Sequence, residues 1–207
     1  LCGFENITAV LLGCSPDFSG LTLQQCAEKM STEPYTALFT LLSNEDKCAL
    51  MADITETQST LEKILKDNLM CFGTDALYAG ESAHPRSGNA AIHLLTENCI
   101  IKNVLSLEEA VNKMTYKVAQ RLKISDRGII KEGNYADIVI FNPKTLKDNS
   151  DLNKPFEKCN GLEYVMVNGE FALKNGELTN STSGRVLLRE PDIKEQVAQK
   201  ANCLQAS

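Results

Sequence analysis

Asp75 is the side chain whose type and position in the sequence best suit catalysis. It follows Leu69–Gly73, an apolar run of five residues that comes after a helical pattern. A short apolar run after a helix is typical of a strand buried on both faces of a parallel sheet. Active sites in parallel α/β architectures are built at the carboxyl ends of strands, so this position favours a catalytic carboxylate facing a cleft. The alternative interpretation is that Asp75 only caps a turn.

Asp75 also opens a long irregular loop, residues 74–89, and such loops are often functional. The loop contains His84, Pro85 and Arg86. Pro85 fixes its own backbone, which limits how its two neighbours can point, and Arg86 offers a planar fork of donors suited to a carboxylate. The alternative is a surface loop with a solvated arginine. His93 lies in an apolar helical stretch, and we interpret it as a packed or partly exposed helix residue.

Metal ligands are few in this sequence. His84 and His93 are the only histidines, so histidine alone cannot supply the three protein ligands of a catalytic zinc site. The eight cysteines are scattered and form no C-x-x-C pair. Because most of them lie in apolar segments, we expect buried thiols in a reducing compartment rather than a disulfide framework or a metal cluster.

The composition is that of an ordinary soluble globular protein. The 207 residues are 43% hydrophobic and 23% charged, which allows one or two domains. The net charge of −6 and the lack of a basic block argue against nucleic-acid binding. The longest apolar runs, such as Ala9–Gly13 and Ile138–Phe141, are too short to span a bilayer, so no membrane partner is expected. We expect a cytoplasmic protein.

The predicted secondary structure changes in kind along the chain. Up to about residue 124, helices and strands alternate, and two capping boxes, Thr22 with Gln25 and Ser106 with Glu109, mark helix starts. Beyond that point come short antiparallel strands. Strands are predicted over Ile7–Gly13, Ala49–Ile54 and Asp137–Phe141, and hairpins at Asn168-Gly169 and Asn175-Gly176. Helices are predicted over Leu23–Met30, over Leu61–Leu69, through Ile92 and Leu95, and over Leu107–Leu122. A further helix is predicted from Pro34, and its residues Tyr35, Leu38, Phe39 and Leu42 fall on one apolar face.

The chain resembles the D-aminoacylases, or N-acyl-D-amino-acid deacylases, of the amidohydrolase superfamily. The segments that carry the resemblance are Gly3–Ile7, Phe72–Asp75, His84–Arg86, Leu107–Thr115, Arg127–Asp137 and Val167–Gly169, within about residues 3 to 188. The run from Arg127 to Asp137 is shared by amidohydrolases in general. The Gly-Thr-Asp and His-Pro-Arg motifs narrow the likeness to the aminoacylase branch. In the hydantoinase and dihydroorotase branch, His and Pro typically follow the strand-end Asp, whereas Ala76 and Leu77 follow it here.

The resemblance implies an α/β fold, namely the C-terminal part of a metal-dependent (β/α)₈ TIM barrel plus strands of a small composite β domain. The corresponding limits are residues 1–126 for the barrel part, 127–188 for the β strands and 189–207 for a tail. It also implies zinc-dependent hydrolysis of N-acyl-D-amino acids, with Zn²⁺, one ion or two, bound mostly by residues outside this chain. Asp75 becomes the general acid/base and a candidate metal ligand, Arg86 a partner of the substrate carboxylate, and His84 a residue that orients the loop.

Two departures from the family pattern bear on this interpretation. The family usually has Gly after the Asp, where this chain has Ala76. Its His-x-His motif and its other metal ligands belong to an N-terminal half that precedes residue 1 here. Because the chain opens with Leu1 rather than Met, we interpret its start as truncated, processed or renumbered, and we expect the missing half as its partner.

Two other functions stay open. The first is a cyclic-amide hydrolase of the dihydroorotase or hydantoinase type, which uses the same barrel. The second is a non-catalytic amidohydrolase-like fragment.

Overall fold

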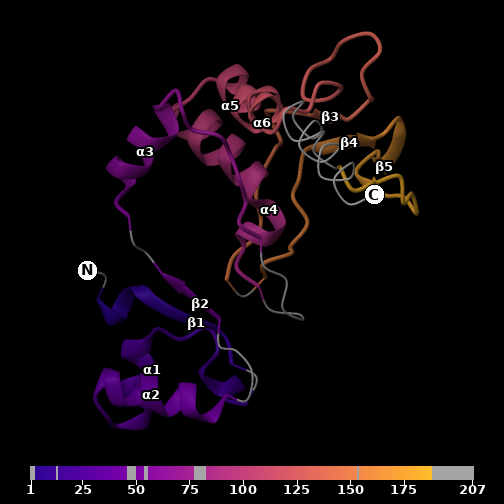
Figure 1. The fold of residues 1–207 in the computed structure, drawn as a ribbon. Coiled ribbons are helices and arrows are strands. Elements are labelled where there is room, and N and C mark those ends of the chain that lie inside the picture. Colours follow the sequence, from indigo (N-terminus) through magenta and orange to yellow (C-terminus); the bar gives the residue numbers. More distant parts are fainter. Residues whose placement is uncertain are drawn as a thin grey trace, which may run out of the picture. The chain divides into compact units, whose positions relative to one another are not determined.

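The structure of this chain is a computed structural model that describes residues 3–12, 14–45, 50–53, 56–76, 83–152 and 154–187. Its elements are η1 (Phe4–Asn6), β1 (Ile7–Leu11), η2 (Pro16–Phe18), α1 (Leu23–Met30), α2 (Pro34–Asn44), β2 (Leu50–Asp53), α3 (Gln58–Lys66), α4 (Arg86–His93), η3 (Leu94–Ile101), α5 (Leu107–Met114), α6 (Tyr116–Leu122), β3 (Ile138–Phe141), β4 (Leu162–Val167), β5 (Glu170–Lys174) and β6 (Glu177–Leu178) (Figure 1). None of the described helices is long and apolar enough to cross a membrane.

The chain divides into two compact units. One takes in residues 1–110 and 141–162, and the other takes in residues 111–140 and 163–207. Each unit is therefore made of two separate stretches of the sequence, and the boundary expected after residue 126 stays a prediction. The expected tail, residues 189–207, lies outside the described residues.

The first elements follow the local signals of the sequence. Strand β1 pairs antiparallel with β2, and Ile7 lies opposite Asp53. Helix α1 begins at the predicted capping box, in which Thr22 and Gln25 exchange hydrogen bonds of 2.9 and 3.2 Å. These hydrogen bonds satisfy two backbone groups that the helix itself cannot pair. The strands and helices enclose a small core that consists of Ala9, Leu12, Leu23, Cys26 and Leu41.

Helix α2 buries only part of the apolar face that the sequence predicts. Its buried residues are Ala37 and Leu41, whereas Tyr35 and Phe39 are 65% and 67% exposed. Helices α1 and α2 pack against each other, and Leu41 joins the core that contains Leu23 and Cys26 of α1. Tyr35 lies edge-on to Phe4, with ring centroids 4.7 Å apart. The apolar residues that the sequence places on one face are thus divided between the core, where Leu38 packs, and the surface.

The predicted strand at Leu69–Gly73 is also absent. Residues 70–76 have no regular secondary structure, and Leu69 is 82% exposed. The chain turns away from α3 at Asp67, whose Oδ1 accepts the Leu69 N–H at 2.7 Å. A parallel strand exists only through hydrogen bonds to neighbours, and both sheets of the described part, β1-β2 and β3-β4-β5-β6, are formed by other segments. The apolar run thus lacks the flanking strands that would bury it.

The long helix predicted over Leu107–Leu122 is divided into α5 and α6. Ser106 caps its start, because its Oγ accepts the Glu109 N–H at 3.1 Å. The break falls at Thr115, which has φ −123° and ψ −85°. Gly128 lies so close to this break that an added Cβ would be 2.8 Å from the Cβ of Ala119. The backbone at Gly128 therefore packs closely against α6. Helical spacing does not reveal such a contact between two segments of the chain.

The two Asn-Gly hairpins are confirmed. Asn168 and Gly169 have φ values of 50° and 85°, and Asn175 and Gly176 have values of 51° and 75°. Positive φ at both central residues is the geometry of a tight type I′ turn, which suits the twist of paired strands. Strand β5 therefore pairs antiparallel with both β4 and β6.

A buried arginine ties the first hairpin to the segment before it. The Arg127 side chain is 9% exposed, forms an ion pair with Asp137 and donates from Nη2 to Asn168 Oδ1. Asp137 also accepts the backbone N–H of Asn168 at 2.8 Å. Although burial raises the pKa of Asp137, hydrogen bonds from Asn168 and Arg127 and the arginine charges hold it below its usual range. These residues of the Arg127–Asp137 motif thus have a structural role.

Arg127→Met is expected to lower the free energy of unfolding by about 2–4 kcal/mol, because it removes the cation that pairs with Asp137, although Asn168 Oδ1 keeps Arg185 as a donor. This range is below that of a fully buried pair, since Asp137 is 35% exposed. A depressed carboxyl pKa stabilises the fold above the unfolded pKa, about 4, and this contribution is lost as pH falls through the folded value. The difference from wild type in urea unfolding should therefore shrink from pH 7 to pH 3. Arg121→Met, at an exposed position of α6, is the control, and equal effects of the two changes would contradict the role of Arg127.

Candidate active site

Asp75 lies at an exposed turn of the described chain. Its side chain is 87% exposed, and its φ of 48° is in the left-handed region, which Asp tolerates better than most residues. Thr74 shapes the turn, because its Oγ1 accepts the Ala76 N–H at 3.3 Å. Ala76 thus follows the Asp at a position where its backbone takes part in the turn. Contrary to the expectation from the sequence, no strand of the described part of the chain ends at this carboxylate.

The structure brings Asp75 and Arg86 together. Asp75 Oδ2 lies 2.9 Å from Arg86 Nη2, and the arginine side chain is 43% exposed. An ion pair this exposed adds little stability, about 0–1 kcal/mol, so it does not explain by itself why the two groups meet. A guanidinium has five N–H donors, so Arg86 can bind a second carboxylate beside Asp75.

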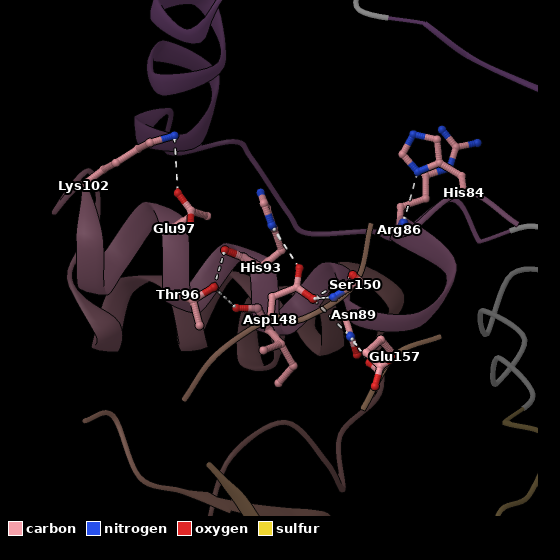
Figure 2. A network of polar contacts seen from close by, with 11 residues as sticks. His84, Arg86, Asn89, His93, Thr96, Glu97, Lys102, Asp148, Ser150 and Glu157 are labelled. Carbon is pink, nitrogen blue, oxygen red and sulfur yellow. Dashed lines mark hydrogen bonds and ion pairs between the residues drawn. The ribbon is translucent and has the colours of Figure 1, made fainter. Parts of the chain in front are cut away.

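His84 contacts the backbone of Arg86. The Arg86 N–H points at His84 Nδ1, 3.1 Å away, just before helix α4 begins (Figure 2). Nδ1 accepts this hydrogen bond, so a neutral His84 carries its proton on Nε2. Burial, and secondly the charge of Arg86, lower the pKa of His84 below its usual 6.5. His84 is therefore neutral at pH 7, which this hydrogen bond requires, and it orders the entry into α4.

A second polar cluster, which the sequence analysis missed, lies further along α4. Its centre is Asp148, whose Oδ1 accepts from Asn89 Nδ2 at 3.1 Å and from the N–H and Oγ of Ser150 at 2.9 and 2.7 Å (Figure 2). Asp148 Oδ2 lies 3.1 Å from His93 Nδ1. The Asp-x-Ser spacing was a usable signal for the local turn, but nothing in the sequence pointed from this turn to α4.

The charge of Asp148 is held by these contacts. Burial raises the pKa of the carboxyl, but hydrogen bonds from Ser150, Asn89 and His93 outweigh it and lower the pKa below its usual value. His93, expected to be a packed or partly exposed helix residue, has a side chain that is 58% exposed.

The described residues do not by themselves make a zinc site. Across those residues, no group of three or more His, Cys, Asp or Glu side chains is placed to hold a metal. Asp75 has a free carboxylate oxygen and suits one coordination position, whereas a catalytic zinc takes three protein ligands. The five cysteines that the structure describes, Cys14, Cys26, Cys71, Cys99 and Cys159, are all free thiols.

Comparisons with known proteins agree with one another. A model of the amidohydrolase family matches residues 32–172. D-aminoacylase of Alcaligenes xylosoxydans xylosoxydans is 30% identical over 174 residues, which are 84% of this chain and 35% of that protein. N-acyl-D-aspartate deacylase of the same organism is 30% identical over 131 residues, 63% of this chain and 26% of that protein. A solved structure of D-aminoacylase, described as having a binuclear metal centre, has a TM-score of 0.79 at 28% identity, covering 89% of this chain and 38% of that one.

Proposed function

This chain belongs to the D-aminoacylase family of the amidohydrolase superfamily, and on that premise we propose that it supplies the general acid/base of a zinc-dependent N-acyl-D-amino-acid deacylase. The observation that carries the proposal is the meeting of two motifs of the deacylase branch in one place. Gly73-Thr74-Asp75 and His84-Pro85-Arg86 are joined by the 2.9 Å contact between Asp75 and Arg86. The chain spans about a third of the length of D-aminoacylase, so the activity is assigned to a larger assembly.

Asp75 is the proposed proton carrier. A zinc ion held mainly by residues that the family places upstream of this chain would supply an activated water. A carboxylate oxygen of Asp75 takes the proton from that water as the water attacks the amide carbonyl. The same oxygen then gives the proton to the leaving amine, so that the amino acid departs as a neutral amine.

Arg86 and His84 are proposed to bind the substrate. The α-carboxylate of an N-acyl amino acid matches the planar fork of a guanidinium, and Arg86 has donors beyond the one that contacts Asp75. His84, through its contact with the Arg86 N–H, fixes where that side chain leaves the backbone. In this proposal Asp75 transfers the proton, and Arg86 recognises the carboxylate of the substrate.

The proposed partner of this chain is the rest of the family's fold. We assign residues 1–126 to the last part of a (β/α)₈ barrel and residues 127–188 to strands of a composite β domain. This assignment explains why the apolar run at Leu69–Gly73 lacks a sheet here and why Leu69 is 82% exposed, because a barrel strand needs neighbours on both sides. Localisation in the cytoplasm is part of the same proposal.

The isolated 207 residues are expected to bind no catalytic zinc and to hydrolyse no N-acyl-D-amino acid. The reason is the ligand count, since the sequence has two histidines and only Asp75 matches a residue that the family places at the metal. Metal analysis of the purified chain and a deacylation assay check this. The same assay after co-expression with the upstream part of D-aminoacylase is the matched comparison, and there activity should appear. Stoichiometric zinc with deacylation by the isolated chain would show that its own residues complete the site.

A further inference from the structure

We infer that Asn89 is a positioning residue that fixes the start of helix α4, and with it Arg86, by joining the helix to the loop around Asp148. The inference rests on the proposed role of Arg86 in binding the substrate carboxylate. The inference connects Arg86 to a cluster of polar residues that neither the motifs nor the comparisons point to. The cluster is formed by Asn89, His93, Asp148, Ser150 and the backbone of Glu157 (Figure 2).

Both side-chain hydrogen bonds of Asn89 are made to the loop that contains Asp148 and Glu157. Its Nδ2 donates to Asp148 Oδ1 at 3.1 Å and to the backbone oxygen of Glu157 at 2.8 Å. An amide nitrogen has two hydrogens, so both donors are used. Asn89 departs from helical geometry within α4, with φ −115° and ψ 16°. The helix therefore bends at the residue that is hydrogen-bonded to the loop, three residues after Arg86.

The helix backbone and the loop approach each other closely at the neighbouring residue. A Cβ added to Gly88 would lie 2.7 Å from the backbone oxygen of Pro155 and 3.3 Å from a ring carbon of Phe156. The first is closer than real Cβ atoms come, so the position requires a glycine for this packing. Gly88 and Asn89 together place the first turn of α4 directly against the loop.

Asp148 is also held in place by hydrogen bonds within its own loop. Ser150 donates twice to Asp148 Oδ1, from its N–H and from its Oγ, in a local turn. The lowered pKa of Asp148 keeps it ionised and an acceptor. His93, one turn after Asn89, contacts the other oxygen. Helix α4 is thus attached at two successive turns, and Arg86 is its first residue, three positions before Asn89.

The consequence for function lies in substrate binding. Loss of the Asn89 contacts would free the first turn of α4 while leaving the Arg86 side chain unchanged. A bidentate contact between a guanidinium and a carboxylate depends on orientation, and a displacement of about 1 Å is enough to weaken it. Loosening should therefore raise KM for N-acyl-D-amino acids and change kcat little.

Asn89→Asp is the informative variant, because Asp has nearly the shape of Asn but turns the donor into an acceptor that faces Asp148 and the Glu157 carbonyl. In the complete zinc-loaded enzyme we expect KM to rise about tenfold with kcat within about twofold of wild type. The control is Asn112→Asp, the same change on the exposed surface of α5, which should leave both constants unchanged. If Asn89→Asp folds poorly, Ser150→Ala, which removes one of the two Ser150 donors, should raise KM in the same direction by about twofold.

Arg86→Gln separates this inference from the proposed function. We expect Arg86→Gln to raise KM strongly. Adding Asn89→Asp to that variant should raise KM little further, since Asn89 is inferred to act through Arg86. A normal KM in Arg86→Gln would overturn the role of Arg86 itself. A raised KM in Arg86→Gln with an Asn89→Asp enzyme that matches the Asn112→Asp control would overturn the positioning role alone. A variant that loses only folded protein, with KM unchanged, would also overturn it, because that is the result of a purely structural contact.

Discussion

Asp75→Asn is expected to lower kcat of the complete enzyme about a thousandfold or more for N-acyl-D-amino acids. The amide has nearly the size of the carboxylate but cannot accept a proton from water at neutral pH. General acid–base catalysis typically contributes about 10²–10⁴-fold, and Asp75 is proposed to act in both the attack and the departure of the amine. Removing one group therefore affects two proton transfers.

The fold should tolerate this change well. The Asp75 side chain is 87% exposed, and its ion pair with Arg86 is a surface contact, so the thermal unfolding temperature should stay close to that of wild type. Asp17→Asn, an equivalent change at an exposed residue of η2, is the control. Turnover of Asp75→Asn within a few-fold of wild type would remove Asp75 from the mechanism. Lost turnover together with lost metal would instead make Asp75 chiefly a ligand.

Those parts of the fold that depend on neighbouring residues follow from the sequence. The capping box at Thr22 and Gln25 and the turn at Asn168-Gly169 form where predicted, because each is a contact between residues one to three positions apart. The strand predicted at Leu69–Gly73 is wrong, and the apolar spacing of α2 does not show which of its residues are buried. Both depend on which surface another segment covers, and hydrophobic spacing does not identify that segment.

The candidate site divides in the same way. Asp75 and Arg86 could be predicted because they lie 11 positions apart in motifs with a recognisable chemistry, and the structure places them 2.9 Å apart. Asn89 and Asp148 are separated by 59 residues and carry no motif. Only folding shows that a turn after β3 supplies acceptors to α4. A lone Asn in a helix and an Asp-x-Ser turn are common, so neither signals such a contact without the other.

Arg86→Gln is expected to raise KM for N-acyl-D-amino acids about a hundredfold, with a smaller loss of kcat. Gln keeps hydrogen-bonding capacity but loses the charge and the planar fork that match a carboxylate. A hundredfold change corresponds to about 2.7 kcal/mol, within the range for removing one partner of a charge pair shielded from water by the substrate. Initial rates over a wide range of substrate concentration measure it.

The matching amide of the substrate, in which the α-carboxylate is replaced by a carboxamide, decides what Arg86 does. If Arg86 binds the carboxylate, wild type should already have a high KM for this amide, and Arg86→Gln should change it little further. If Arg86 serves only as the counter-ion of Asp75, which it contacts at 2.9 Å, the variant should lose kcat equally with both substrates. The carboxylate-specific rise in KM is the expected result, because one guanidinium has enough donors for the substrate and for Asp75 at the same time.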